Sequence, residues 1–188
     1  MFDMYEQFYL KFQNKTVFMS EEDEEIHGRF LKRSMALCKR YNYELLEESE
    51  RRDLLNELFH GAPDSLMITE PFFCDVGYNI SWGEGDYLNY GCVILDIGEV
   101  KFGDHVSLGP GVKIAAVDHP RDPEERARHA LIGKPITIGN NVWIGANSVI
   151  LGGVTIADDI IIGAGSVVTS DLTETGTYVG APARIVRK

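Results

Sequence analysis

The chain is short of positive charge, has few cysteines and contains no long apolar run. Its 188 residues include 18 Lys and Arg against 29 Asp and Glu, a formal net charge of −11. This excess of acid argues against nucleic-acid binding, because proteins that hold a phosphate backbone show a basic surface. No stretch approaches the roughly 20 apolar residues of a membrane span, and residues 1–18 lack the apolar core of a secretory signal. We therefore expect a soluble cytoplasmic protein that binds neither nucleic acid nor membrane.

The cysteines Cys38, Cys74 and Cys92 are too few and too irregularly spaced for a disulfide framework or a structural zinc site, so we expect reduced, mostly buried thiols. Glycine, in contrast, is abundant. It accounts for 19 of the 188 residues, whereas average usage is about 7%. Collagen is excluded because no G-x-y triplet repeats. The glycines must serve another regular structure.

Only one glycine, Gly28, precedes residue 61, and this part of the chain has helical patterning. Ser20 and the acidic residues after it favour a helix N-terminus, and leucines then recur at helical spacing until Gly61. We predict two amphipathic helices, at about 22–41 and 44–59. They form an N-terminal helical segment, residues 1–61, which packs on the remainder as part of one structural unit.

From residue 76 onward, aliphatic residues recur every six positions. The regular series is Ile138, Ile144, Ile150, Ile156, Ile162 and Val168, and an earlier block keeps the same register at Phe102, Leu108 and Ile114. A period of six is typical of a short strand followed by a turn, repeated without change of direction. Such a chain is mainly β and builds a parallel β-helix with three faces per coil of about 18 residues. We assign residues 62–188 to this hexapeptide-repeat solenoid.

The repeat is interrupted once, between Ile114 and Ile138. Residues 116–134 hold two prolines and dense charge but no inward aliphatic ladder, so we predict a loop extruded from the coil. Long loops on a rigid scaffold usually carry function. His119 stands at the start of this loop, and a neutral imidazole can accept a proton from a hydroxyl. His119 is therefore a candidate general base.

The other histidines offer less. His27 and His60 belong to the helical segment and are expected to face solvent, His105 is expected in a surface turn of the coil, and His129 lies deep in the loop. A carbonic-anhydrase-like zinc enzyme on the same coil would need three converging histidines, and His105 and His119 could supply two. This alternative stays open at the level of the sequence.

Five motifs are more specific than the repeat itself. They are Asn89–Asp96 (NYGCVILD), Leu108–Val112 (LGPGV), Asp118–Pro120 (DHP), Gly133–Gly145 (GKPITIGNNVWIG) and Gly180–Arg184 (GAPAR). Together they resemble the maltose/galactoside O-acetyltransferase family of hexapeptide-repeat sugar acetyltransferases, from about Leu45 to Arg187 and more loosely back to Phe18. The resemblance implies a left-handed parallel β-helix that forms a homotrimer. Each of its three active sites would lie between neighbouring subunits and receive acetyl-CoA and a sugar hydroxyl.

The resemblance also implies roles for individual positions. His119 matches the general base, and the matching acceptor-site positions are Asn89, Asp75, Asp23 and the cleft-lining Trp143. The matching CoA positions are Ala146, Ala164, Thr169, Ser170, Arg184 and Arg187, and no metal ligand is implied. Two positions depart from the family: Ser170 replaces a frequent Lys, and Ile97 stands where the galactoside-type member has an acid that touches its sugar. Galactoside specificity is therefore not implied.

The residue types suit direct acetyl transfer. Acetyl-CoA is already an activated thioester, so a base suffices, and a backbone N–H such as that of Ala146 could stabilise the oxyanion. The basic C-terminal residues Arg184, Arg187 and Lys188 would attract CoA phosphates. We predict transfer of acetyl from acetyl-CoA to a hydroxyl of a maltose-, glucose- or galactoside-like sugar in a ternary complex. The alternatives are a non-enzymatic β-helix interaction module, the zinc enzyme, and acetyl transfer to an amino or serine acceptor.

Overall fold

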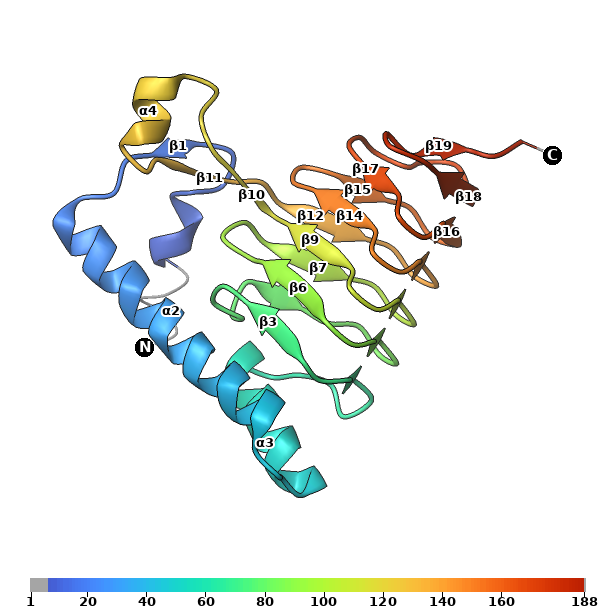
Figure 1. Cartoon of the computed structure of the whole chain (residues 1–188), viewed down its shortest axis with the longest axis horizontal. Coiled ribbons are helices and arrows are strands. Elements are labelled where there is room, and N and C mark those ends of the chain that lie inside the picture. Colours follow the sequence, from blue (N-terminus) through green and yellow to red (C-terminus); the bar gives the residue numbers. More distant parts are fainter. Residues whose placement is uncertain (1–6, 188) are drawn as a thin grey trace.

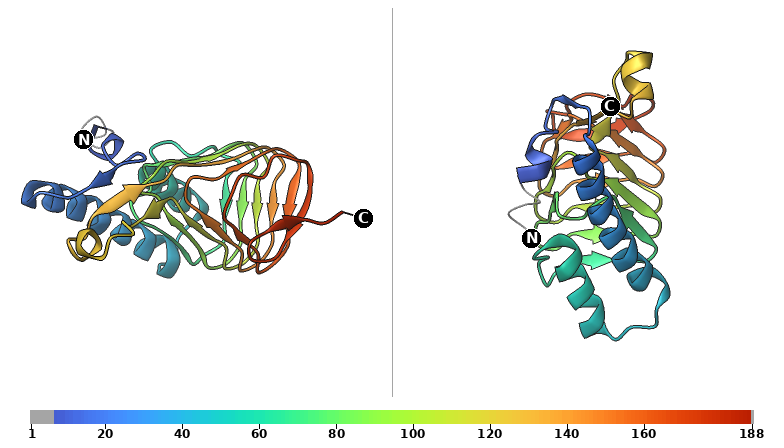
Figure 2. Two further views of the ribbon diagram at one scale, coloured as in Figure 1. Left: turned by 90° about the horizontal axis from the view of Figure 1, so that it is seen from above. Right: turned by 90° about the vertical axis from the view of Figure 1, so that its left-hand side faces the viewer.

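The six-residue repeat folds as strands of two to four residues that stack in parallel on three faces (Figure 1). The computed structural model of the chain describes residues 7–187. The helices lie along one side of this stack and across its first coil (Figure 2). The predicted parallel β-helix is confirmed.

Each face of the solenoid is one sheet. The seven-stranded sheet runs in the order β19 (Arg184–Ile185), β18 (Gly176–Val179), β16 (Ile160–Ile162), β13 (Trp143–Ile144), β8 (Ser107–Leu108), β5 (Tyr87–Leu88) and β2 (Met67–Ile68). The five-stranded sheet contains β17 (Val167–Val168), β14 (Val149–Leu151), β9 (Lys113–Ala115), β6 (Cys92–Leu95) and β3 (Phe72–Cys74). The four-stranded sheet contains β15 (Thr155–Ile156), β12 (Ile136–Ile138), β7 (Val100–Phe102) and β4 (Ile80–Ser81). Within these three sheets, all strand pairs are parallel except β18 with β19.

The coils are not all of the expected length. Trp143 pairs with Ile161, eighteen residues later, as predicted, but in the first coils Met67 pairs with Tyr87, twenty residues later. The additional residues lie in the turns between the five-stranded and four-stranded sheets, and the extruded loop leaves from the same edge. We call this edge the insertion corner, and it comprises residues 75–79, 96–99 and 116–135.

Inward and outward side chains alternate along the strands. The inward aliphatic residues of the repeat, such as Ile114, Ile144 and Ile150, are fully buried in one continuous core. The outer face of the four-stranded sheet is polar, with Ser81, Lys101, Thr137 and Thr155. The outer face of the five-stranded sheet is apolar apart from Lys113, with Phe73, Val93, Val149, Leu151 and Val167. The solenoid therefore presents one face suited to water and one suited to a partner.

Two long helices precede the solenoid. Helix α2 (Glu21–Tyr43) begins at the predicted cap, where the Ser20 side chain and Asp23 form a capping box. Helix α3 (Glu48–Phe59) begins four residues later than predicted, because the backbone is extended at both Glu44 and Glu47. Leucines of α3 join the main core beneath the first coil. None of the helices within residues 7–187 is long and apolar enough to cross a membrane.

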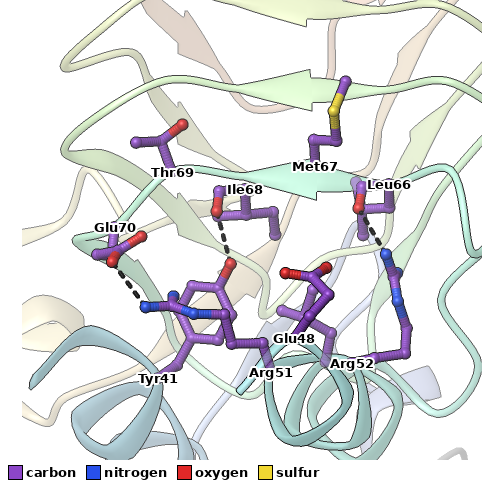
Figure 3. A pocket seen from close by; sticks show the side chains of 10 residues that line it. Tyr41, Glu48, Arg51, Arg52, Leu66, Met67, Ile68, Thr69 and Glu70 are labelled. Atoms are coloured by element: carbon purple, nitrogen blue, oxygen red, sulfur yellow. Dashed lines mark hydrogen bonds and ion pairs between the residues drawn. The ribbon is translucent and has the colours of Figure 1, made fainter. Parts of the chain in front are cut away.

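Side chains from these helices close the exposed edge of the solenoid (Figure 3). The Tyr41 hydroxyl donates to the carbonyl oxygen of Ile68 at 2.5 Å, and Arg52 donates to that of Leu66 at 3.2 Å. An open edge strand would otherwise offer its carbonyl groups to another chain. The helical segment therefore caps the first coil.

The extruded loop contains regular secondary structure. It contains β10 (Val117–Asp118), helix α4 (Pro123–Ala127) and β11 (Leu131–Gly133), and β11 also pairs with β1 (Thr16–Val17) of the N-terminal segment. A second apolar cluster lies beneath it, formed by Phe8, Tyr9, Phe12, Phe30, Val76 and Ile97. The segment before α2 thus holds the loop against the insertion corner.

Candidate active site

A groove of about 420 Å³ lies on the outer face of the seven-stranded sheet, at the turn toward the five-stranded sheet. Four predicted site residues are brought together in it: Asn89, Trp143, Ala146 and Ala164. The other lining residues are Gly109, Pro110, Gly145, Ile161, Ile162 and Gly163. Trp143 is 55% exposed and Ile161 is 40% exposed, so the walls are apolar and open to solvent.

The floor of the groove is flat because neighbouring coils approach closely there. A Cβ atom on Gly145 would lie 2.5 Å from the backbone nitrogen of Ala164, and one on Gly109 would lie 2.7 Å from that of Ala146. Glycine is therefore required for coil stacking, and the same lack of side chains leaves room for a long, narrow ligand. Within residues 7–187, no oxygen accepts a hydrogen bond from the Ala146 N–H. This N–H is thus available to a ligand in the groove.

Positive charge lies farther along the same sheet. Arg184 belongs to β19, which pairs with β18 beyond the groove, and its side chain is exposed. Arg187 is also exposed and stands 4.0 Å from the Glu174 carboxylate. Two guanidinium groups at the end of an apolar groove are suited to phosphate groups. The third basic residue of the prediction, Lys188, lies outside the described residues.

His119 lies elsewhere, in the loop at the insertion corner, and its side chain is exposed. Its Nδ1 atom is 3.1 Å from the carbonyl oxygen of Ala130. A carbonyl oxygen only accepts, so Nδ1 must carry the hydrogen and the neutral ring leaves Nε2 free to take a proton. The preceding residue, Asp118, accepts instead from the His119 backbone N–H and pairs with Arg121. The Ala130 carbonyl therefore orients the imidazole.

Two predicted acceptor residues lie near the same corner. Asp75 follows β3, and burial raises the pKa of its carboxyl to about 6. Asp23 pairs with Lys11 and also accepts from the backbone N–H of Ser20 at 3.1 Å. The hydrogen bond from Lys11 is the main reason why the pKa of Asp23 lies below its usual range. Both Asp23 oxygens thus have partners in the helix cap and the N-terminal segment.

The predicted site residues therefore form two groups at opposite edges of the five-stranded sheet. The groove lies at one edge, whereas His119 and Asp75 lie at the other. Thr169 and Ser170 directly follow β17, which places them on the His119 edge, and both are exposed. The two groups of candidate residues do not meet within one chain.

The structure also shows features that the sequence reasoning missed. Asp96 is fully buried at the insertion corner, and burial raises the pKa of its carboxyl to about 7. Ile97 is only 3% exposed beneath the N-terminal segment. His27 does not face solvent as predicted: it is half-buried, with Nδ1 2.8 Å from the Tyr9 hydroxyl. The acidic residue at the end of the NYGCVILD motif was the available signal for Asp96. The six-residue periodicity does not show which side chains are buried in a turn.

The three cysteines are free, as expected, and Cys38 and Cys92 are buried. Within residues 7–187, no group of three or more His, Cys, Asp and Glu side chains is placed to hold a metal ion. His105 has a positive φ of 59° in a turn that precedes the seven-stranded sheet, whereas His119 lies at the insertion corner. The two histidines considered for zinc therefore do not converge within one chain.

A second cavity, of about 340 Å³, lies between helix α3 and strand β2 (Figure 3). Its two arginines serve the fold: Arg51 pairs with Glu70 at 2.9 Å, and Arg52 donates to the carbonyl oxygens of Pro63, Asp64 and Leu66. Neither arginine offers a free charge to a ligand. This cavity is a by-product of edge capping.

Known sequences match most of the chain. A family model described as bacterial transferase hexapeptide (six repeats) matches residues 135–170. Nodulation protein L of Rhizobium meliloti (strain 1021) is 47% identical over 155 residues, which cover 80% of this chain and 82% of that protein. The galactoside O-acetyltransferase of Escherichia coli (strain K12) is 37% identical over 157 residues, covering 83% of this chain and 77% of the relative.

Two solved structures extend the similarity to almost the whole chain. The maltose O-acetyltransferase from Clostridium difficile 630 has a TM-score of 0.84 at 35% identity and covers 92% of this chain and 98% of its own. The hexapeptide-repeat acetyltransferase from Vibrio cholerae O1 biovar eltor, complexed with acetyl coenzyme A, has a TM-score of 0.76 at 34% identity and covers 91% of both chains. The fold is a left-handed parallel β-helix, and acetyl-CoA is the co-substrate. The chain therefore belongs to the hexapeptide-repeat acetyltransferase family, which includes the maltose and galactoside O-acetyltransferases.

Proposed function

We propose that the protein transfers acetyl from acetyl-CoA to a hydroxyl of a mono- or disaccharide. The observation that carries this proposal is the bond between His119 Nδ1 and the Ala130 carbonyl, because it leaves Nε2 as an exposed, oriented base. The maltose and galactoside enzymes named above act on sugars according to their names, which supports the choice of acceptor. Asp75 and Asn89 are the proposed sugar contacts.

The proposed reaction is a direct transfer within a ternary complex. His119 Nε2 takes the proton of the sugar hydroxyl while its oxygen attacks the thioester carbonyl carbon. The Ala146 N–H donates to the oxyanion that forms. Collapse of this intermediate breaks the C–S bond, and the imidazolium returns its proton to the CoA thiolate. The pantetheine arm would lie over Ala146 and Ala164.

We further propose that the protein is a homotrimer whose sites lie between subunits. Each chain presents its groove and His119 at opposite edges of the five-stranded sheet, so a neighbouring copy must supply the missing half. The apolar outer face of this sheet supports burial against a neighbour, since Phe73 and Leu151 are each 40% exposed. Arg184 and Arg187 would hold the CoA phosphates, while Thr169 and Ser170 would face the cofactor from the neighbouring chain.

The direct test is thiol release from acetyl-CoA across a panel of sugars, for the wild type and His119→Ala. We expect sugar-dependent release by the wild type, and a decrease of about 10²–10⁴-fold in kcat for the variant, because that is the typical contribution of a general base. Sugar must be acetylated in proportion to the thiol released, which mass spectrometry of the product checks.

Two results would contradict the proposal in different ways. Equal rates for the wild type and His119→Ala with the best sugar would show that His119 is not the base. Thiol release that depends on an amine or serine rather than on any sugar would move the enzyme to another acceptor class. Glu124→Ala is the control in the same loop, because the Glu124 side chain is exposed, and it should leave thiol release unchanged.

A further inference from the structure

The insertion corner contains a carboxylate that the proposed reaction does not use. This residue is Asp96, whose side chain is 0% exposed. Its two side-chain oxygens accept four backbone N–H groups, all from the turn at residues 75–79. The donors are Asp75 at 3.1 Å, Val76 at 3.0 Å, Gly77 at 2.8 Å and Asn79 at 3.3 Å.

The same short stretch also contacts the start of the loop that carries His119, where the two ends of the loop meet. Gly98, two residues after Asp96, donates its N–H to the carbonyl oxygen of Ala116 at 2.8 Å. Lys134, at the far end of the loop, donates to that same oxygen at 2.9 Å. Residues 96–98 therefore connect the turn of Asp75 to the base of the His119 loop.

Asn79 completes this arrangement. Its side-chain amide donates to the carbonyl oxygens of Asp96 at 2.7 Å and of Ile97 at 3.1 Å. The turn is thus held at its start and at its end. Burial of a carboxylate costs free energy, and an apolar side chain in the turn would avoid this cost. The two additional residues of the coil therefore do not by themselves explain why a buried carboxylate is present here.

We propose that Asp96 is a positioning residue for acetyl transfer: its carboxylate fixes the turn that carries Asp75 relative to the loop that carries His119. This inference rests on the proposed function, in which Asp75 contacts the sugar and His119 takes its proton. Asp96 itself is too deeply buried to touch the sugar. Asp96 therefore acts indirectly, by fixing the position of Asp75, which contacts the sugar.

The experiment replaces Asp96 with asparagine. The side chain of Asn has one acceptor oxygen and one donating amide, so it cannot accept from all four N–H groups and the turn must shift. We expect the sugar KM of Asp96→Asn to rise by roughly 10-fold or more, since misplacement by about 1 Å can cost about 10²-fold. The KM for acetyl-CoA should stay within about twofold of the wild type, because the turn that Asp96 holds carries the proposed sugar contact Asp75 and none of the proposed CoA contacts.

Asp86 supplies a matched control. It is also 0% exposed and accepts two backbone N–H groups, from Gly83 at 2.9 Å and Val106 at 2.8 Å. The turn that it closes, residues 83–86, carries none of the predicted site residues. Asp86→Asn should therefore leave the sugar KM unchanged. Asn79→Ala loosens the 75–79 turn without changing a carboxylate, and it should raise the sugar KM even if Asp96→Asn fails to fold.

Hydrogen exchange gives a readout that does not depend on catalysis. Amides of residues 75–79 should exchange faster in Asp96→Asn than in the wild type or Asp86→Asn. An unchanged sugar KM in folded Asp96→Asn and Asn79→Ala, or an equal rise in Asp86→Asn, overturns the positioning role. If the wild type releases no CoA with any sugar, the proposed function has failed. Unchanged exchange at residues 75–79 would then show separately that Asp96 does not hold the turn.

Discussion

The hydrogen bond between His119 and Ala130 shows what one sequence can reveal about a residue and what it cannot. The position of His119 at the start of a loop marks it as a candidate base. The group that orients its ring is a backbone carbonyl eleven residues away, across the folded loop. No local pattern selects that carbonyl among the others of the loop. The neighbouring acid, Asp118, is bonded elsewhere.

Asp75 allows a prediction about pH. Burial raises the pKa of Asp75 to about 6, so its carboxyl gains a proton as the pH falls through this value and accepts hydrogen bonds from a sugar less well. We expect the sugar KM of the wild type to be low near pH 8 and to rise as the pH falls, because Asp96, whose carboxylate holds the same turn and whose pKa burial raises to about 7, gains a proton before Asp75 does. Initial rates at varied sugar concentration from pH 5 to pH 8 measure this.

Asp75→Asn isolates the contribution of this carboxyl. The variant should have a raised sugar KM at every pH and a smaller rise at acidic pH than the wild type, because only Asp96 still gains a proton there. The comparison of the two proteins rests on the sugar KM and not on the rate at saturation. A sugar KM that is independent of pH in the wild type would remove Asp75 from the acceptor site.

Among the elements, the short strands were the most predictable part. An inward aliphatic residue every sixth position determines where each strand lies, and Ile144, Ile150 and Ile162 are all buried as expected. The first coils contain two more residues than the repeat predicts. Those residues form the turns of the insertion corner, which are held by side-chain hydrogen bonds such as those to Asp96 and not by hydrophobic periodicity. The start of α3 was placed too early for a similar reason, because leucine spacing does not show the extended backbone before Glu48.

The glycines of these elements allow a paired prediction about stability. Gly28 lies within helix α2, and a Cβ atom there would meet nothing within 4 Å. Gly28→Ala should therefore stabilise the protein by about 0.5–1 kcal/mol, the difference in helix propensity. A Cβ atom on Gly145 would lie 2.5 Å from the backbone of the next coil. Gly145→Ala should destabilise by about 1–3 kcal/mol through overpacking.

Urea denaturation at one fixed protein concentration measures both free energies of unfolding, since the stability of the proposed homotrimer would depend on protein concentration. The same chemical change is made at the two positions, so each variant is the control for the other. If Gly145→Ala were as stable as the wild type, close approach of the coils could not be the reason for glycine at this position.

At the scale of the whole molecule, the arrangement of the site follows from the order of the three faces. From β2 to β15, each coil passes from the seven-stranded to the five-stranded and then to the four-stranded sheet, and β16 and β17 repeat the first of these steps. The groove lies at the first of these turns and His119 at the second. The sequence motifs identify both groups of residues, but the six-residue period alone does not show that a sheet separates them. That separation is a property of the closed coil.

Subunit mixing tests whether two chains share each site. Ala164→Trp should block the groove and His119→Ala should remove the base, so each variant alone should be nearly inactive. When equal amounts are unfolded and refolded together, half of the grooves and half of the bases are intact, and about a quarter of the sites in a randomly mixed trimer should combine both. Thiol release with the best sugar should then recover to about a quarter of the wild-type rate, whereas each variant refolded alone should recover none. Activity of the mixture no greater than that of the two variants would show that the groove and His119 do not meet between chains.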